Sequence, residues 1–110
     1  MSAFNVVEGV VATCPQCHQA TTVSVQFKFG AVINSRYRIG DVVRWGANEN
    51  GEPGKRRVVV YGAVGLPCSI CGFDGDWDFD VFISNDKIVE VLPSSGVYNF
   101  ACAGRSYIEI

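Results

Sequence analysis

Four cysteines stand in two CxxC pairs, and they are the residues of this chain best suited to chemistry. Cys14 and Cys17 form the first pair, and Cys68 and Cys71 form the second. Two thiolates three residues apart can hold one ion between them, because the intervening turn aims both sulfurs inward. Two such pairs complete a tetrahedron of sulfurs, which is the preferred coordination of structural zinc. We therefore predict one structural Zn²⁺ ion bound by these four residues.

Two other metal interpretations use the same cysteines. The run from Cys14 to His18 matches the CxxCH pattern of covalent haem attachment, but His18 is the only histidine and Met1 the only methionine. A second axial ligand for haem is therefore scarce. Four thiolates also bind iron in rubredoxin-like sites, so the ligand set leaves zinc and iron both open. The fifth cysteine, Cys102, has no partner nearby in the sequence, and we interpret it as a small core residue.

The apolar side chains predict an all-β protein. The chain holds 17 valines and 7 isoleucines but only 2 leucines, and β-branched residues fit a pleated sheet better than a helix. Apolar and polar residues alternate over 22–29 and again over 76–83, as in half-buried strands. Asn85-Asp86 has the composition of a hairpin turn. Further strands are expected at 4–12 with a central Gly9, at 37–45 with a break, at 56–64, at 87–92 and in the tail, 97–110.

The chain repeats its own pattern at an offset of 54 residues. Cys14 and Cys17 correspond to Cys68 and Cys71, and the alternating strand at 22–29 corresponds to the one at 76–83. Each half therefore reads as a strand, a CxxC turn and an alternating strand. Neither half has enough ligands for a metal, so two similar hairpins are expected to face each other across one site.

The two CxxC turns resemble the knuckles of zinc-ribbon proteins, which have the patterns CPxC and CxxCG. The resemblance covers residues 11–20 and 67–73 with the strands beside them. The spacer of 50 residues between Cys17 and Cys68 is long for a ribbon. We therefore expect one domain over 1–110, built from two knuckle hairpins and an inserted β-hairpin, with a flexible polar loop at 46–55. The layout also resembles small bacterial immunity proteins that neutralise toxins.

Acidic residues occupy alternate positions directly after the second CxxC pair. On a strand, alternate side chains share one face, so these acids would form either a solvated face or a docking strip for a basic partner. The strip consists of Asp74, Asp76, Asp78 and Asp80. Together with the closed metal site it predicts a non-catalytic protein-binding module, with a toxin as one candidate partner.

Basic residues gather elsewhere and support an alternative function. Residues 28–57 hold seven basic and three acidic side chains, and basic residues mixed with aromatics can bind single-stranded nucleic acid. The candidate residues are Arg44, Trp45, Arg56 and Arg57. The isoelectric point of about 5.2 argues against this alternative. A thiolate redox or electron-transfer protein is a third possibility.

Several classes of protein are disfavoured. Four cysteine ligands leave a zinc ion no open position for hydrolysis, and the chain has no Gly-rich phosphate loop, so we expect no enzyme. No apolar run reaches the 18 residues that suggest a membrane span. The first residues lack a basic stretch followed by an apolar one, so a cytoplasmic location with reduced cysteines is expected.

Overall fold

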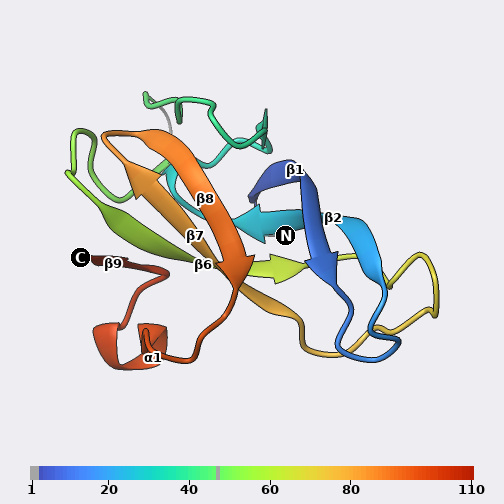
Figure 1. Cartoon of the computed structure of the whole chain (residues 1–110). Helices are drawn as coiled ribbons and strands as arrows, with labels where there is room; N and C mark the ends of the chain where they lie inside the picture. Colours follow the sequence, from blue (N-terminus) through green and yellow to red (C-terminus); the bar gives the residue numbers. More distant parts are fainter. Residues whose placement is uncertain (1–2, 47) are drawn as a thin grey trace.

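The computed structural model describes residues 3–46 and 48–110, except the side chain of Cys102, and confirms the all-β prediction (Figure 1). The elements are β1 (Asn5–Thr13), β2 (Ala20–Phe27), β3 (Gly30–Ala31), β4 (Arg36–Tyr37), β5 (Glu49–Asn50), β6 (Val58–Val64), β7 (Asp78–Ser84), β8 (Lys87–Pro93), α1 (Phe100–Ala103) and β9 (Tyr107–Glu109). One curled sheet has the order β4-β1-β2-β6-β7-β8, with β9 also paired to β6. The short β3 and β5 pair separately.

Two antiparallel hairpins, β1–β2 and β6–β7, form the frame of the sheet, and β2 pairs with β6 to join them. In the first hairpin Val10 lies opposite Val23. At the corresponding place in the second, Val64 donates its N–H to the carbonyl of Trp77 at 3.2 Å. The two hairpins therefore share one register beside their CxxC turns. Gly9 takes a φ of 73° at the bulge in β1, a conformation that suits glycine.

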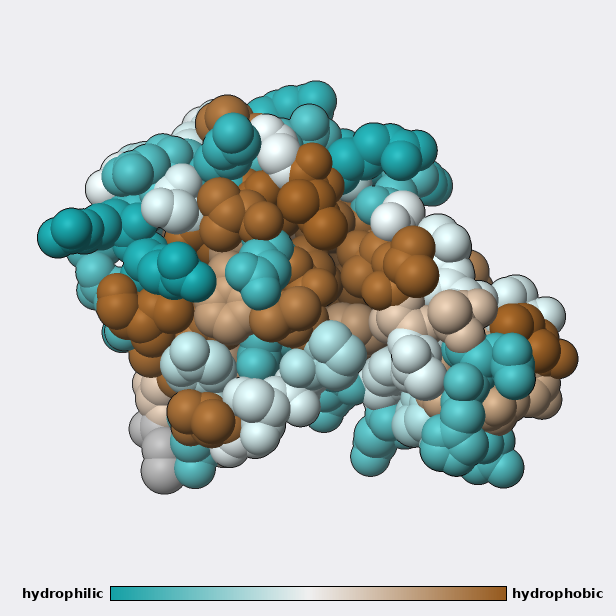
Figure 2. Space-filling model, viewed as in Figure 1, coloured by the Kyte–Doolittle hydropathy of each residue, from teal (hydrophilic) through white to brown (hydrophobic). Residues whose placement is uncertain are grey.

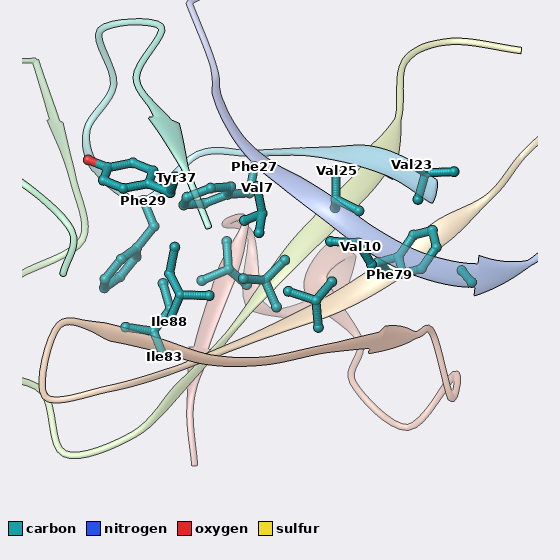
Figure 3. Packing of buried hydrophobic residues seen from close by; sticks show 14 of the residues in the cluster. Val7, Val10, Val23, Val25, Phe27, Phe29, Tyr37, Phe79, Ile83 and Ile88 are labelled. Atoms are coloured by element: carbon teal, nitrogen blue, oxygen red, sulfur yellow. The ribbon is translucent and has the colours of Figure 1, made fainter. Parts of the chain in front are cut away.

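The core lies inside the curl of the sheet. Figure 3 shows side chains from β1 and β2 pointing toward those from β7 and β8. The alternation predicted from the sequence is confirmed on β2, whereas on β7 the apolar positions are buried as predicted but Asp80 and Phe82 on the opposite face are buried too. The predicted apolar positions that are buried are Val23, Val25, Phe27 and Phe29 in the first half and Trp77, Phe79, Val81 and Ile83 in the second.

The predicted hairpin turn at Asn85-Asp86 is confirmed. Both residues have positive φ, 49° and 69°, as a type I′ turn requires, and Ser84 and Lys87 pair directly beyond them. Asn and Asp tolerate this conformation better than most residues.

The segment between the hairpins is less regular than the sequence predicts. The expected strand over 37–45 is wrong: only its first residue belongs to a strand, β4, and Val42 makes an isolated bridge to Lys87. The inserted hairpin is reduced to the two-residue pairing of β3 with β5. Most of the predicted 46–55 loop is described, and Asn48 and Asn50 tie it by donating to the carbonyls of Val32 and Lys28. Residue 47 of that loop lies outside the described residues.

The tail forms one strand, β9, and the short helix α1, which the sequence did not predict. This segment lies against the outer face of the second hairpin: the rings of Phe100 and Tyr98 pack on Tyr61 and Phe82. The described residues contain no helix with the length and apolar character needed to cross a membrane. The interpretation of Cys102 as a core residue concerns a side chain outside the described set.

Candidate metal centre

The two CxxC turns fold into matching loops, which we call the first knuckle (residues 14–19) and the second knuckle (residues 68–73). In the first, the N–H of Cys14 donates to the carbonyl of Gln19 at 3.0 Å, and the N–H of His18 donates to the carbonyl of Cys14 at 3.0 Å. In the second, Cys68 and Gly72 make the corresponding bonds, each at 2.8 Å. The sequence repeat is therefore a repeat of backbone hydrogen bonds.

The four sulfurs come together as the sequence predicts. All of them lie within 4.8 Å of one another. The shortest separations join the two knuckles: 3.8 Å from Cys14 Sγ to Cys71 Sγ and 3.9 Å from Cys17 Sγ to Cys68 Sγ. A tetrahedron of sulfurs about 2.3 Å from a central zinc has edges of about 3.8 Å. The cluster thus has the size that a four-thiolate metal site requires, and it could hold a metal ion.

The cluster is continuous with the core. Cys14 and Cys68 are buried, Cys17 is half-buried and Cys71 is exposed. Trp77 belongs to the apolar cluster that contains the two buried cysteines, and Phe73 packs against that cluster. The hydroxyls of Thr21 and Ser69 are hydrogen-bonded at 3.0 Å, which joins β2 directly to the second knuckle. The four-cysteine cluster therefore lies directly beside the core and ties the second knuckle to β2.

The thiols ionise unequally. Backbone N–H groups of Cys71 and Ile70 hold the pKa of the Cys68 thiol down to about 6. The N–H of Phe73 acts in the same sense on Cys71, but partial desolvation of its sulfur and hydrogen bonds with the neighbouring sulfurs outweigh it and raise the pKa of that thiol to about 12. A second thiolate beside the first is unfavourable. A divalent cation would remove this repulsion, so metal binding should release protons and acid should release the metal.

His18 and Gly72 follow the second cysteine of each knuckle, and both have positive φ, 59° and 78°. A side chain in this conformation costs about 1–2 kcal/mol. We predict that His18→Gly raises the free energy of unfolding by roughly 0.5–1 kcal/mol, after the greater flexibility of unfolded glycine is deducted. Denaturant unfolding of the metal-loaded proteins measures this change.

Gly72→Ala is the matched control for His18→Gly. No atom lies within 4 Å of the position that a Cβ on Gly72 would take, so its effect reports the backbone alone, and stability should fall by about 1 kcal/mol. A His18→Gly protein less stable than the wild type would show instead that the imidazole supports the site.

The acidic strip divides into accessible and buried members. Asp74, Asp76 and Asp78 are exposed, but Asp80 is only 3% exposed. Asp80 Oδ2 accepts hydrogen bonds from the backbone N–H and the hydroxyl of Ser95, at 3.2 and 3.4 Å. The expectation that all four carboxylates face solvent is therefore wrong for Asp80, because the chain after β8 folds over it. Only Asp78 and Asp80 belong to a strand, β7.

The basic residues of the alternative interpretation lie against aromatic rings. The guanidinium of Arg44 lies 5.9 Å from the ring centre of Tyr37, and that of Arg57 lies 5.3 Å from that of Phe82. Trp45 packs edge-on against Phe29 with ring centres 5.3 Å apart, and its Nε1 is buried. Arg56 is exposed. Trp45 is half-buried and packs against the core, which limits the surface that it can offer to a base.

Sequence reasoning missed a groove lined by residues of β2 and β6 and by residues just before β1 and β9. Phe4, Gln26, Tyr61 and Ala63 belong to it. The only signal in the sequence was the alternation within each strand. That signal does not tell which strands become neighbours.

Comparison of the chain with protein-family models, with curated proteins and with solved structures finds no match.

Proposed function

We propose that this protein is a non-catalytic protein-binding module whose fold is stabilised by one structural zinc ion, in the manner of a small inhibitor or immunity protein. The observation that carries the proposal is the four-sulfur cluster formed between the two knuckles. Four thiolates fill the coordination sphere of zinc and leave no position for a substrate or an activated water. The ion's contribution is therefore to hold two hairpins together and to fix the loops beside them.

The choice of a protein partner is supported by the accessible acids next to the metal site. Asp74, Asp76 and Asp78 are exposed, and like charges so close together do not stabilise the isolated domain. The ion pairs found in the described part of the chain are Arg36–Glu8, Lys55–Glu52 and Lys55–Glu109, so these acids have no basic side chain beside them. Asp78 accepts a hydrogen bond from the Tyr61 hydroxyl but keeps its charge, so all three acids can attract a basic partner, with an attraction that weakens as salt is added.

Native mass spectrometry tests the metal part of the proposal. We expect one zinc ion per chain and slow labelling of the four cysteines by a thiol reagent while the ion is bound, because coordinated thiolates are poor nucleophiles. Folded protein that carries no metal when freshly purified would overturn the proposal. Iron in place of zinc, or rapid labelling of all four cysteines in the loaded protein, would support an electron-transfer or redox function instead.

Titration with fluorescent single-stranded DNA and RNA tests the alternative. We expect no binding at physiological salt, because the chain has a net charge of −2 and the ring of Trp45 is packed against the core. Binding that the triple substitution of Arg44, Arg56 and Arg57 by alanine abolishes, with a salt dependence that reports released counterions, would favour the nucleic-acid function. The matched variant with Asp74, Asp76 and Asp78 changed to asparagine should leave such binding equal or stronger.

A further inference from the structure

The four cysteines of the candidate metal site differ in their access to solvent. Cys71 is exposed, Cys17 is half-buried, and Cys14 and Cys68 are buried. Figure 1 shows both knuckles at the end of the molecule away from α1, and Figure 2 shows that end as a lobe set apart from the rest of the surface. A small reagent dissolved in water therefore reaches Cys71 before it reaches the other three cysteines.

Access decides which of these sulfurs reacts first when a metal ion is bound. A thiol that coordinates a metal ion loses its proton outright, so all four sulfurs of a loaded site are thiolates. Oxidation of a cysteine depends on its thiolate character and on its exposure. Because the loaded site makes every sulfur a thiolate, exposure identifies Cys71 as the first target of a peroxide.

A sulfur of the first knuckle lies in contact with Cys71. Cys14 Sγ is 3.8 Å from Cys71 Sγ, although the two residues are 57 positions apart in the chain. The other two cysteines, Cys17 and Cys68, also meet across the knuckles, with their sulfurs 3.9 Å apart. Cys14 is therefore placed to attack an oxidised Cys71 sulfur, and the resulting disulfide would join the two hairpins.

We propose that Cys71 is a peroxide-sensitive site, and that its oxidation ends in a Cys14–Cys71 disulfide that replaces the metal ion as the link between the knuckles. The inference rests on the proposed zinc site and adds a chemical response to it. The ion is released in the process, because only Cys17 and Cys68 remain as ligands.

The chemistry needs one hydrogen peroxide molecule for each disulfide. The Cys71 thiolate takes one oxygen atom from the peroxide and becomes a sulfenic acid, and the second oxygen leaves as hydroxide. The Cys14 thiolate then attacks the oxidised sulfur, forms the S–S bond and expels another hydroxide. The two thiolates together lose two electrons, and the peroxide gains them.

The pairing of the sulfurs decides whether the domain survives the loss of its ion. A Cys14–Cys71 bond connects the β1–β2 hairpin to the loop before β7, and a link between such distant positions restricts the unfolded chain. A bond within one CxxC pair would connect close neighbours only and would leave the knuckles free to separate. We therefore expect the oxidised, zinc-free protein to stay folded, although the reduced, zinc-free protein does not.

Peptide mapping distinguishes the two kinds of pairing. Trypsin leaves residues 1–28 and residues 58–87 as intact peptides, because neither contains an internal Lys or Arg, and each carries one CxxC pair. Zinc-loaded protein is treated with one equivalent of hydrogen peroxide, its remaining thiols are blocked, and it is digested without reductant. We expect the two peptides to be joined by a disulfide that fragmentation places between Cys14 and Cys71. One zinc ion should pass to a coloured chelator for each link formed.

Three controls accompany the mapping. N-ethylmaleimide in limiting amount, added to the loaded protein, should label Cys71 ahead of the other three ligands. Cys102→Ala removes the one cysteine outside the site and should give the same link. The oxidised protein should keep its circular dichroism spectrum in the presence of a chelator, and dithiothreitol should then abolish that spectrum unless zinc is returned.

A first disulfide within one CxxC pair, a first disulfide that lacks Cys71, or an oxidised protein that unfolds would overturn the inference. Loaded protein that does not react with peroxide would overturn it as well. Failure of the proposed function is a different result, namely folded protein that carries no metal when freshly purified. A domain that binds one zinc ion but gives any of the contrary outcomes would lose only the assignment of Cys71.

Discussion

Replacing Cys68 by serine should cost the protein its tight metal binding and most of its folded population. Cys68 is buried, and its sulfur lies 3.9 Å from that of Cys17 on the opposite knuckle. Zinc binding is worth about 10–16 kcal/mol in small zinc domains, whereas an entire domain is stable by only about 5–15 kcal/mol. Loss of one of four ligands therefore removes a contribution comparable to the whole stability. Elemental analysis and circular dichroism of the purified variant measure both effects.

Ser69→Ala is the matched control for Cys68→Ser. It removes the hydroxyl contact with Thr21 on the same knuckle but touches no sulfur, so the variant should keep its metal and lose about 1 kcal/mol at most. Wild-type protein treated with a strong chelator should behave like Cys68→Ser. If Cys68→Ser bound one metal per chain and melted with the wild type, the four-ligand assignment would be wrong.

Replacing Asn5 by alanine should destabilise the domain by roughly 3–5 kcal/mol, the largest effect we expect away from the metal. Asn5 is fully buried. Its Nδ2 donates to the carbonyls of Phe29 and Ala31 at 3.0 and 3.1 Å, and its Oδ1 accepts the N–H of Ser35 at 3.1 Å. The substitution leaves these three backbone groups without the side chain that satisfies them. Denaturant unfolding of the zinc-loaded protein measures the loss.

Asn50→Ala is a control that distinguishes the effect of burial on stability from the effect of the number of hydrogen bonds lost. Asn50 also uses its Nδ2 for two contacts, with the carbonyl of Lys28 at 2.7 Å and the hydroxyl of Ser106 at 2.9 Å, but it is only half-buried. Water can replace these contacts, so the cost should be about 1 kcal/mol. Equal losses in the two variants would show that Asn5 does not anchor the segment after β2 in the way its contacts indicate.

The candidate metal centre was predictable because each of its two CxxC turns is local. Each CxxC turn aims two sulfurs to one side through contacts within about six residues. The repeat at 54 residues indicates that two such turns contribute to one site. The strands beside the turns were predictable for the same reason. Val23, Val25 and Phe27 alternate with polar neighbours, and all three are buried. The Asn85-Asp86 turn needs only its two residues and their tolerance of positive φ.

The burial of individual residues in the acidic strip could not be predicted from the local sequence. The alternation of Asp78 and Asp80 correctly places both on a face opposite the apolar residues, but nothing in the alternation says what covers that face. Asp80 is buried because Ser95 folds over it, whereas Asp78 stays exposed. The segment after β8 returns to the sheet and determines which side chains on this face are buried. Its position depends on packing between rings such as Phe82 and Tyr98.

The sequence by itself therefore determined the all-β class, the paired hairpins and the four cysteines of the candidate metal site, because strand alternation and CxxC spacing depend on the order of neighbouring residues. Only the tertiary structure decided the groove lined by Gln26, Tyr61 and Ala63, the burial of Asp80 and the packing of Trp45 against the core. Those features depend on strand register and on contacts between distant segments: Gln26 meets Ala63 and Tyr61 meets Asp78 only after the hairpins have joined. Alternation reports which side of a strand a residue occupies, and register between strands decides which side chains it meets there.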